Sequence, residues 1–210
     1  MISMLFGPPG CGKGTQAASL AGHFCVPHVA TGDIFRKNLK DGTPLGVAAK
    51  GFMEKGLLVP DELTCEMVAD RISGADCASG VLFDGFPRSL AQARWLIGVS
   101  AGKAAQVVSI EVPTAVLIDR IAGRRVCSKC SATYHATYDP PPEFCRSCGS
   151  SSIVQRPDDQ EDVVRARLET YARDTAPVLD VLRSAFPVHV VDGVGSVDQV
   201  GQRILQALGA

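Results

Sequence analysis

A glycine-rich stretch near the start of the chain, residues 7–15 with the sequence GPPGCGKGT, constrains the fold most. It follows the apolar run 2–6 and precedes a segment in which apolar residues recur at helical spacing. Glycines allow successive backbone N–H groups to converge on one centre, a helix N-terminus favours negative charge, and Lys13 adds a mobile cation. The order strand, loop, helix therefore predicts a phosphate-binding loop, although Gly14 stands where the common pattern has a serine or threonine.

Short β-rich runs alternate with helical segments along the rest of the chain. Alternation of this kind predicts an α/β fold, in which a parallel sheet is covered by helices on both faces. Right-handed crossovers place the strand ends, and with them the phosphate-binding loop, along one edge of the sheet. The predicted sheet has five strands, at residues 2–6, 26–30, 81–83, 106–112 and 188–191.

Further helical features are expected from the spacing of apolar and turn residues. Between the second and third strands lies a small helical insertion, whose first helix we expect Thr31 or Asp33 to cap. A long helical stretch begins at residues 158–159 and is interrupted near Pro177. Ser196 is expected to cap the last helix of the chain.

Composition and charge limit the classes of function. Of the 210 residues, 46% are hydrophobic and 20% charged, as in an ordinary globular domain, and the formal net charge is −1. With no net positive charge to attract nucleic acid or an acidic membrane, a bound polyanion needs a local cluster of cations. Residues 1–6 are too short for a signal-peptide core, and no apolar run is long enough to span a bilayer. We therefore expect a cytoplasmic protein that binds neither membrane nor nucleic acid.

Four of the eight cysteines form two C-x2-C pairs, within a segment from 125 to 155 that is rich in cysteine, proline, serine and tyrosine. Two such pairs supply four thiolates to one tetrahedral centre, which favours structural Zn2+, with iron as the alternative. A segment with few large apolar side chains needs a metal in place of a core. The scattered Cys25, Cys65 and Cys77 are expected to be small buried hydrophobic residues. The predicted metal ligands are Cys127, Cys130, Cys145 and Cys148.

Arginines bracket this cysteine-rich segment on both sides. Arg120, Arg124 and Arg125 precede it, and Arg156 and Arg167 follow it. Such a segment beside a phosphate loop could contact nucleic acid or stiffen a lid over a nucleotide. Because arginine binds phosphate oxygens bidentately, the bracketing arginines favour a lid that clamps phosphates.

The sequence offers no obvious nucleophile. The histidines lie in unremarkable settings, and no Ser-His-Asp or Cys-His arrangement is supported. This favours phosphoryl transfer, in which positioning and charge neutralisation supply most of the catalysis. Asp84, at the end of the third strand, is the preferred residue to organise Mg2+ through water, and Asp33 is the second choice.

Several motifs, taken in order, resemble those of the adenylate kinase family. They are G-x-P-G-x-G-K-G-T-Q at residues 7–16, T-G-D at 31–33, D-G-F-P-R at 84–88, G-R-R at 123–125, and R-x-D-D at 156–159 followed by Arg167. The resemblance covers essentially the whole chain, and the family pattern includes Gly14. The cysteine-bearing segment is similar to the long lid of the zinc-containing bacterial-type members.

The resemblance implies the phosphate-loop nucleoside monophosphate kinase fold and the reaction ATP + AMP ⇌ 2 ADP, with Mg2+ on the phosphates. ATP, AMP and ADP would be the partners of a monomeric protein. The single domain, residues 1–210, would have its core at 1–30, 60–123 and 160–210. The monophosphate-binding part would be residues 31–59, named the helical insertion below, and the zinc-binding lid would be residues 124–159, named the cysteine insertion.

The functional residues of the family can be carried over position by position. The implied catalytic residues are Lys13, Asp84, Arg88, Arg124, Arg156 and Arg167. The implied ATP-binding residues are Gly10, Cys11, Gly12, Lys13, Gly14, Thr15, Arg120, Arg124, Thr133, Tyr134, Tyr138 and Gly195. The implied AMP-binding residues are Thr31, Arg36, Leu57, Leu58, Val59, Gly85, Phe86, Pro87, Arg88, Gln92, Arg156 and Arg167. In this arrangement Arg120 and Tyr138 sandwich the adenine of ATP.

Two positions depart from patterns common in the family. Leu57 stands where some members carry a lysine, so only a backbone contact to AMP is kept at this position. Cys148 stands where several zinc-bearing members have an aspartate, and a fourth thiolate strengthens the predicted metal site. Thr31 and Gln92 resemble the adenine-selective set, and a kinase for UMP or CMP is the nearest alternative. A nucleotide-gated nucleic-acid-binding module is the alternative from another class, but the near-zero net charge argues against it.

Overall fold

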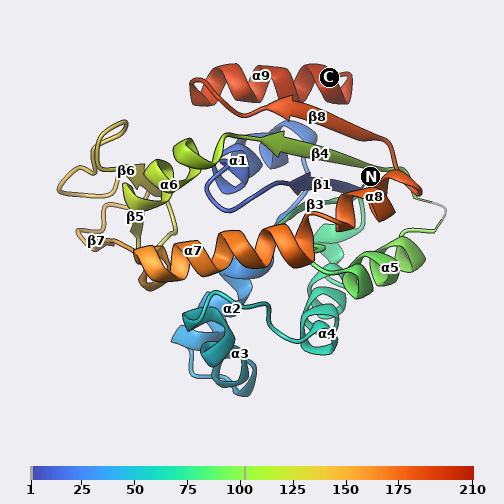
Figure 1. Ribbon diagram of the computed structural model, residues 1–210, viewed down its shortest axis with the longest axis horizontal. Coiled ribbons are helices and arrows are strands. Elements are labelled where there is room, and N and C mark those ends of the chain that lie inside the picture. Colours follow the sequence, from blue (N-terminus) through green and yellow to red (C-terminus); the bar gives the residue numbers. More distant parts are fainter. Residues whose placement is uncertain (1, 102) are drawn as a thin grey trace.

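The main sheet of the protein has five parallel strands, as the sequence predicts, and their order is β2-β3-β1-β4-β8. The computed structural model describes residues 2–101 and 103–210. Figure 1 shows the sheet with helices on both of its faces. The strands are β1 (Ile2–Phe6), β2 (His28–Ala30), β3 (Val81–Asp84), β4 (Ala105–Glu111) and β8 (Val188–Asp192).

Each face of the sheet carries its own apolar core, because successive side chains of a strand point to opposite faces. Met4 lies in one cluster and its neighbour Leu5 in the other, and Phe83 and Leu82 of β3 divide in the same way. The first cluster includes buried residues of α4 (Asp61–Ile72), α5 (Leu90–Val99) and α8 (Val178–Arg183). The second includes those of α1 (Lys13–Phe24), α6 (Thr114–Ala122) and α9 (Val197–Leu208).

The strands end together at one edge of the sheet. Asp84 at the end of β3 pairs with Leu5 of β1 on one side and with Ala30 of β2 on the other. Glu111 and Asp192, which end β4 and β8, also pair with each other. Since β1 lies between β3 and β4, the strand order reverses beside it, and ligands of open α/β sheets bind at such a point.

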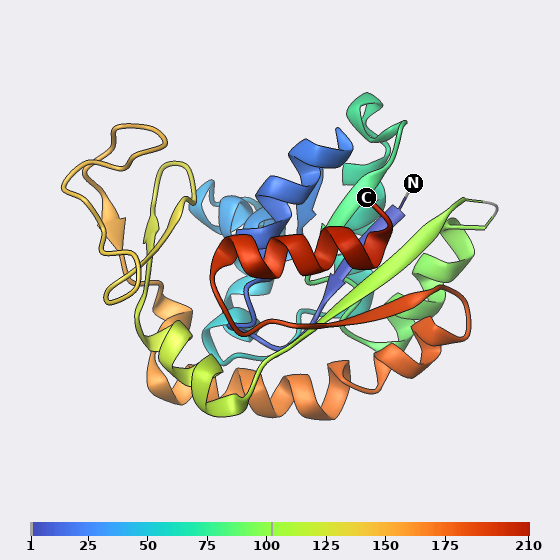
Figure 2. The same cartoon turned by 90° about the horizontal axis from the view of Figure 1, so that it is seen from above.

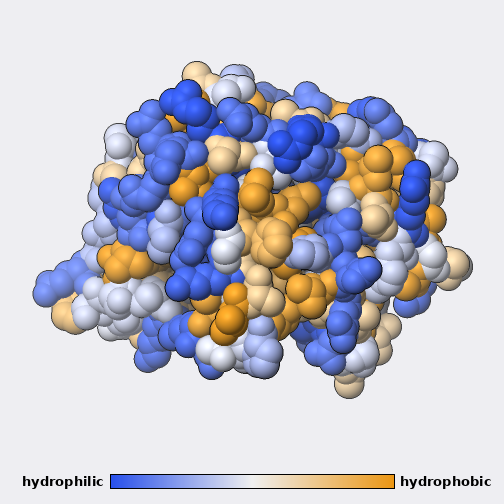
Figure 3. Space-filling model, turned by 60° about the horizontal axis from the view of Figure 1, so that its bottom comes forward, coloured by the Kyte–Doolittle hydropathy of each residue, from blue (hydrophilic) through white to orange (hydrophobic). Residues whose placement is uncertain are grey.

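The helical insertion consists of α2 (Thr31–Lys40) and α3 (Pro44–Glu54), which pack against each other below the sheet in Figure 1. The expected side-chain cap of its first helix is wrong, because Ala30 occupies the N-cap position and no side chain caps it. The Thr31 hydroxyl instead donates to the Gly85 carbonyl oxygen at 2.9 Å, and Asp33 pairs with Arg36. Apolar and hydrophilic areas alternate on this side of the molecule (Figure 3).

The cysteine insertion forms a separate three-stranded antiparallel sheet in the order β6-β5-β7. Its strands are β5 (Arg124–Cys127), β6 (Thr133–His135) and β7 (Ile153–Val154). Figure 2 shows that this unit projects from the side of the molecule, away from the helices that cover the main sheet. The apolar periodicity of the sequence does not reveal strands this short.

The helical stretch after the cysteine insertion is interrupted near Pro177, as expected, but its α-helix begins slightly later than expected. A 3-10 turn (Pro157–Asp159) precedes α7 (Glu161–Thr170), and a π-helical turn (Tyr171–Thr175) separates α7 from α8. The interruption begins one turn ahead of Pro177, because a proline ring collides with the carbonyl of the preceding helical turn and widens it.

The predicted cap of the last helix is confirmed, but the predicted burial of the scattered cysteines is not. Ser196 caps α9 through a capping box with Gln199, as predicted. The expectation that the scattered cysteines are buried is wrong, since Cys25 is exposed and Cys65 and Cys77 are half-buried. Cys77 lies in a short 3-10 helix (Ala75–Cys77). Within residues 2–101 and 103–210, no helix is both long and apolar enough to cross a membrane.

Candidate active site

A cleft of about 1770 Å3 opens at the carboxyl edge of the main sheet. The phosphate loop forms its floor, and the helical and cysteine insertions contribute walls. Pockets for a single small ligand usually measure about 300–1,000 Å3, so this cleft has room for more than one such ligand.

The phosphate loop curls between β1 and α1 through residues with positive φ. Gly7, Gly10 and Gly12 have φ values of 138°, 84° and 102°, which favour glycine. A side chain at Gly10 would also collide with the body of the protein, because its Cβ would lie 2.9 Å from the Leu117 carbonyl oxygen. The Lys13 ammonium donates to the carbonyl oxygens of Gly7 at 2.7 Å and Pro8 at 3.0 Å. The cation is thereby held over the loop and beside the first turn of α1.

Asp84 stands at the end of β3, where the sequence analysis expects a metal-organising carboxylate. His28 Nε2 lies 3.4 Å from Asp84 Oδ2, so the expectation that this histidine has an unremarkable setting is wrong. Burial by itself raises the pKa of Asp84, but the hydrogen bond from His28 and the charges of Lys13 and Arg88 outweigh it and leave the pKa below its ordinary value. The carboxylate is therefore ionised at neutral pH.

Arg88 is held in the cleft by contacts to backbone. Its Nε donates to the Gly85 carbonyl oxygen at 2.7 Å, and its own carbonyl oxygen accepts from the Thr175 hydroxyl at 2.8 Å. Gly85 is required here, since its φ is 69° and a Cβ would lie 2.5 Å from Arg88 Nη2. Burial lowers the pKa of Arg88, as do the nearby charges of Arg36 and Arg156. Within the described part of the chain this guanidinium forms no ion pair, so the site favours an anion.

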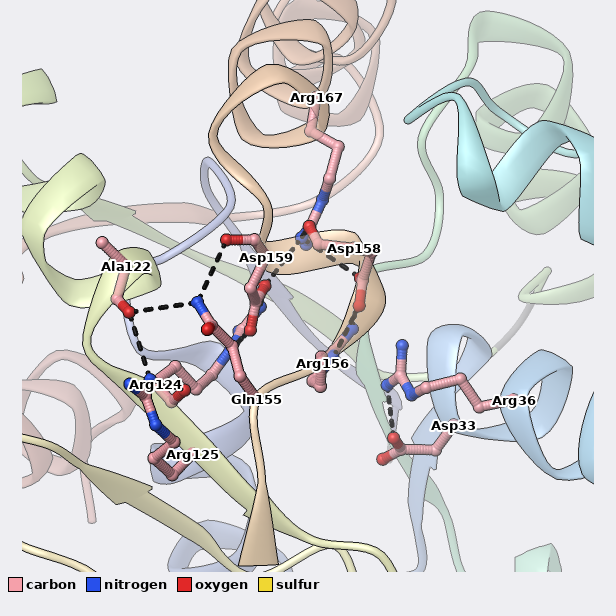
Figure 4. Close-up of polar contacts among 10 residues, drawn as sticks. All are labelled: Asp33, Arg36, Ala122, Arg124, Arg125, Gln155, Arg156, Asp158, Asp159 and Arg167. Atoms are coloured by element: carbon pink, nitrogen blue, oxygen red, sulfur yellow. Dashed lines mark hydrogen bonds and ion pairs between the residues drawn. The ribbon is translucent and has the colours of Figure 1, made fainter.

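Three further arginines meet two aspartates where the cysteine insertion joins the core (Figure 4). Arg124 binds the buried Asp159 bidentately, and Arg156 binds Asp158 through contacts of 2.9 and 2.6 Å. Arg167 lies 3.1 Å from Asp158 Oδ2 and 3.2 Å from Asp159 Oδ1. The two carboxylates thus hold three guanidinium groups together at the cleft that the phosphate loop also lines.

The charges of this network shift the pKa values of its members. Burial raises the pKa of Asp158, but Arg156 and Arg167 more than reverse this and hold it far below its ordinary value. Burial lowers the pKa of Arg167 to about 10, with Arg124 and Arg156 adding to the effect. Asp158, Arg156 and Arg167 therefore carry charge at neutral pH. An incoming phosphate can compete with the aspartates for the arginines.

The residues implied for AMP line the cleft, with one exception. Phe86 is buried against Phe83 and Trp95 and does not line it. Gln92 lines the cleft but is only 2% exposed, because its amide oxygen accepts from the Arg88 N–H and its amide nitrogen donates to Asp61, each at 2.7 Å. The cleft-lining members are Thr31, Arg36, Leu57, Leu58, Val59, Gly85, Pro87, Arg88, Gln92, Arg156 and Arg167.

The residues implied for ATP all line the same cleft. The Tyr138 ring is 69% exposed and stacks on His135 with ring centroids 4.4 Å apart. Arg120 Nη2 donates to the Gly193 carbonyl oxygen at 3.0 Å. Tyr134 differs from these, since its side chain is only 4% exposed. The lining members are Gly10, Cys11, Gly12, Lys13, Gly14, Thr15, Arg120, Arg124, Thr133, Tyr134, Tyr138 and Gly195.

The four cysteines of the cysteine insertion converge as predicted. Their Sγ atoms all lie within 4.8 Å of one another, with Cys127 and Cys148 3.6 Å apart and Cys130 and Cys145 3.5 Å apart. Sulfurs around a tetrahedral Zn2+ with bonds of about 2.3 Å are separated by about 3.8 Å, so the geometry fits such an ion. A hydrogen bond from Tyr134 favours the thiolate form of Cys145 and lowers its pKa.

Three residues that support the site were missed by the sequence analysis. His28 pairs with Asp84, Thr175 fixes the backbone of Arg88, and Asp61 holds both Gln92 and the Ser89 hydroxyl. The sequence signals only the helix cap that Asp61 contacts, because Ser89 and Gln92 have the three-residue spacing of a capping pair.

The fold, with a phosphate loop and several arginines lining one cleft, defines the class of the phosphate-loop kinases. The sequence supports this class, because residues 5–186 match the model of the family "Adenylate kinase". The chain belongs to the adenylate kinase family. It is 48% identical to the adenylate kinase of Clostridium acetobutylicum and 45% identical to that of Clostridium botulinum, in each case over 100% of this chain and 99% of the relative. It is 44% identical to the adenylate kinase of Clostridium kluyveri, with the same coverage.

Proposed function

We propose that the protein catalyses reversible phosphoryl transfer from ATP to AMP, giving two ADP, and so balances the adenine nucleotide pool. The observation that carries this proposal is the convergence of the phosphate loop and the arginines of three chain segments on one cleft with room for two nucleotides. The names of the relatives agree with it.

ATP and AMP would occupy opposite sides of this cleft. The phosphate loop and Lys13 bind the ATP phosphates, while Arg120 and Tyr138 hold the adenine. Thr31, Arg36 and the backbone of residues 57–59 bind AMP. The residues implied by the family keep these roles as a proposal, which their shared position in the cleft supports.

Charge neutralisation drives the proposed transfer. Arg88, Arg124, Arg156 and Arg167 gather around the transferred group, and the phosphates compete with Asp158 and Asp159 for three of them. The cysteine insertion, residues 124–159, would close as a lid, and the helical insertion, residues 31–59, would close over AMP against the core. Closure excludes the water that would otherwise hydrolyse ATP.

Two metal ions are part of this proposal. Bound Mg2+ would neutralise phosphate charge, and the ionised Asp84 is suited to hold it through water. The four cysteines would hold a structural Zn2+, because a closed sulfur set leaves no position for substrate. Following the family resemblance, we propose that the protein works as a monomer in the cytoplasm, with nucleotides and no nucleic acid as ligands.

A coupled ADP-formation assay with a panel of monophosphates tests the function. ATP consumption that depends on AMP and is much weaker with UMP or CMP is expected. Preference for UMP or CMP would identify a different monophosphate kinase. ATP turnover that responds to oligonucleotides and to no monophosphate would refute the kinase proposal.

A further inference from the structure

A buried tyrosine lies at the centre of the cysteine insertion. The apolar cluster there has three buried members, Cys127, Tyr134 and Cys145, among the residues that the structure describes. Tyr134 is 4% exposed, and its neighbours on β6 are exposed or half-buried. A side chain of this size in so small a core has to satisfy its hydroxyl group internally.

The hydroxyl of Tyr134 has two partners, both in the second C-x2-C pair. It accepts the backbone N–H of Arg146 at 2.9 Å, and it lies 3.2 Å from Cys145 Sγ. A backbone N–H can only donate, so the hydroxyl proton is left to point at the sulfur. Cys145 Sγ in turn lies 3.5 Å from Cys130 Sγ, within the predicted ligand set.

The ring is also held from outside. The Arg146 guanidinium lies 5.0 Å from the centre of the Tyr134 ring and 2.6 Å from the Asp139 carboxylate. The Asp139 carbonyl oxygen accepts the N–H of His135, the residue after Tyr134, at 2.9 Å. These contacts hold the Tyr134 ring in place between Arg146 and the backbone of β6.

We propose that Tyr134 is a positioning residue of the metal centre, whose hydroxyl donates to the Cys145 thiolate and fixes it as a ligand. This rests on the metal site of the proposed function. It also gives the Tyr134 side chain a role other than the ATP contact that the family resemblance implies. Four thiolates around a divalent cation carry a net charge of −2, so a hydrogen bond to one sulfur stabilises the centre. Partners of metal ligands commonly contribute about 10–100-fold in metal affinity.

The test compares Tyr134→Phe with Tyr138→Phe, which removes an exposed hydroxyl from the same insertion. Zinc affinity is measured by competition with a chelating dye on the full-length protein. We expect a loss of about tenfold or more for Tyr134→Phe and no change for Tyr138→Phe. In the Co2+-loaded proteins, the thiolate-to-metal absorption band should shift only for Tyr134→Phe. Similar melting temperatures at saturating zinc would show that both variants fold.

Each outcome decides between specific claims. A wild-type protein that binds no zinc would refute the metal site itself. If the wild type binds zinc and Tyr134→Phe keeps the same affinity and absorption band, the positioning role is refuted and the metal site stands. A raised KM for ATP with unchanged zinc affinity would return Tyr134 to the nucleotide site. The zinc-loaded wild type gives a second measurement, because a slowly exchanging Tyr134 hydroxyl proton is expected in NMR, and rapid exchange would contradict the hydrogen bond.

Discussion

Replacing Arg88 with alanine should remove most activity and leave the stability nearly unchanged. The variant loses the hydrogen bond from Arg88 Nε to the Gly85 carbonyl oxygen, which costs about 0.5–1.5 kcal/mol. It also loses the attraction of Asp84, which raises the pKa of Arg88. In return it relieves the burial of a cation and the repulsion of Arg36 and Arg156, both of which lower that pKa. The two effects oppose each other, so the melting temperature should change by about 4 °C or less.

The expected loss of activity is much larger. Arginines that neutralise charge on a transferred phosphoryl group contribute about 10³–10⁵ to kcat, which corresponds to about 4–7 kcal/mol. The assay is ADP formation at saturating ATP and AMP, with calorimetry on the same samples. Arg94→Ala, an exposed position on α5, is the matched control and should keep wild-type activity. Wild-type kcat in Arg88→Ala, or a variant that fails to fold, would refute the reasoning.

Three further predictions concern the metal, acid stability and the backbone at Gly85. Cys130→Ser, or chelator treatment of the wild type, should lower both the zinc content and the melting temperature; an unchanged zinc content by elemental analysis would count against the site. Asp158 has a lower pKa in the folded protein than in the unfolded chain, so its stabilisation is complete above the ordinary carboxyl pKa of about 4 and is lost as the pH falls below it. Asp158→Asn should therefore flatten the dependence of melting temperature on pH between 6 and 3, and an unchanged slope would contradict this. Gly85 has a φ of 69°, and the Cβ of a Gly85→Ala variant would lie 2.5 Å from Arg88 Nη2. The variant should keep the fold and lower kcat at least tenfold, roughly the effect of a small displacement of a catalytic group. An unchanged kcat would show that Arg88 tolerates the shift.

Local sequence patterns predicted the sheet, the phosphate loop and the metal ligands. The alternation of apolar runs gave the strands, and parallel strands necessarily bring their carboxyl ends to one edge, so Asp84 had to lie near the loop. The C-x2-C spacing placed four sulfurs together without knowledge of the fold.

Such local patterns could not predict contacts between segments that are distant in the sequence. Thr31 bonds to Gly85 across 54 residues, and His28 meets Asp84 across 56, so each pair is fixed by strand register and by no local preference. Tyr134 was hidden for another reason. A tyrosine in a polar, cysteine-rich segment has the pattern of a surface residue, and only the convergence of the cysteines buries it.

The central claim is the transfer of a phosphoryl group between two nucleotides in one cleft. Phosphorus NMR of the wild-type protein with Mg2+, ATP and AMP tests it most directly, because every phosphorus species is counted together. The account predicts that one ATP and one AMP disappear for every two ADP formed, with no inorganic phosphate. Inorganic phosphate released at the same rate with and without AMP would contradict it.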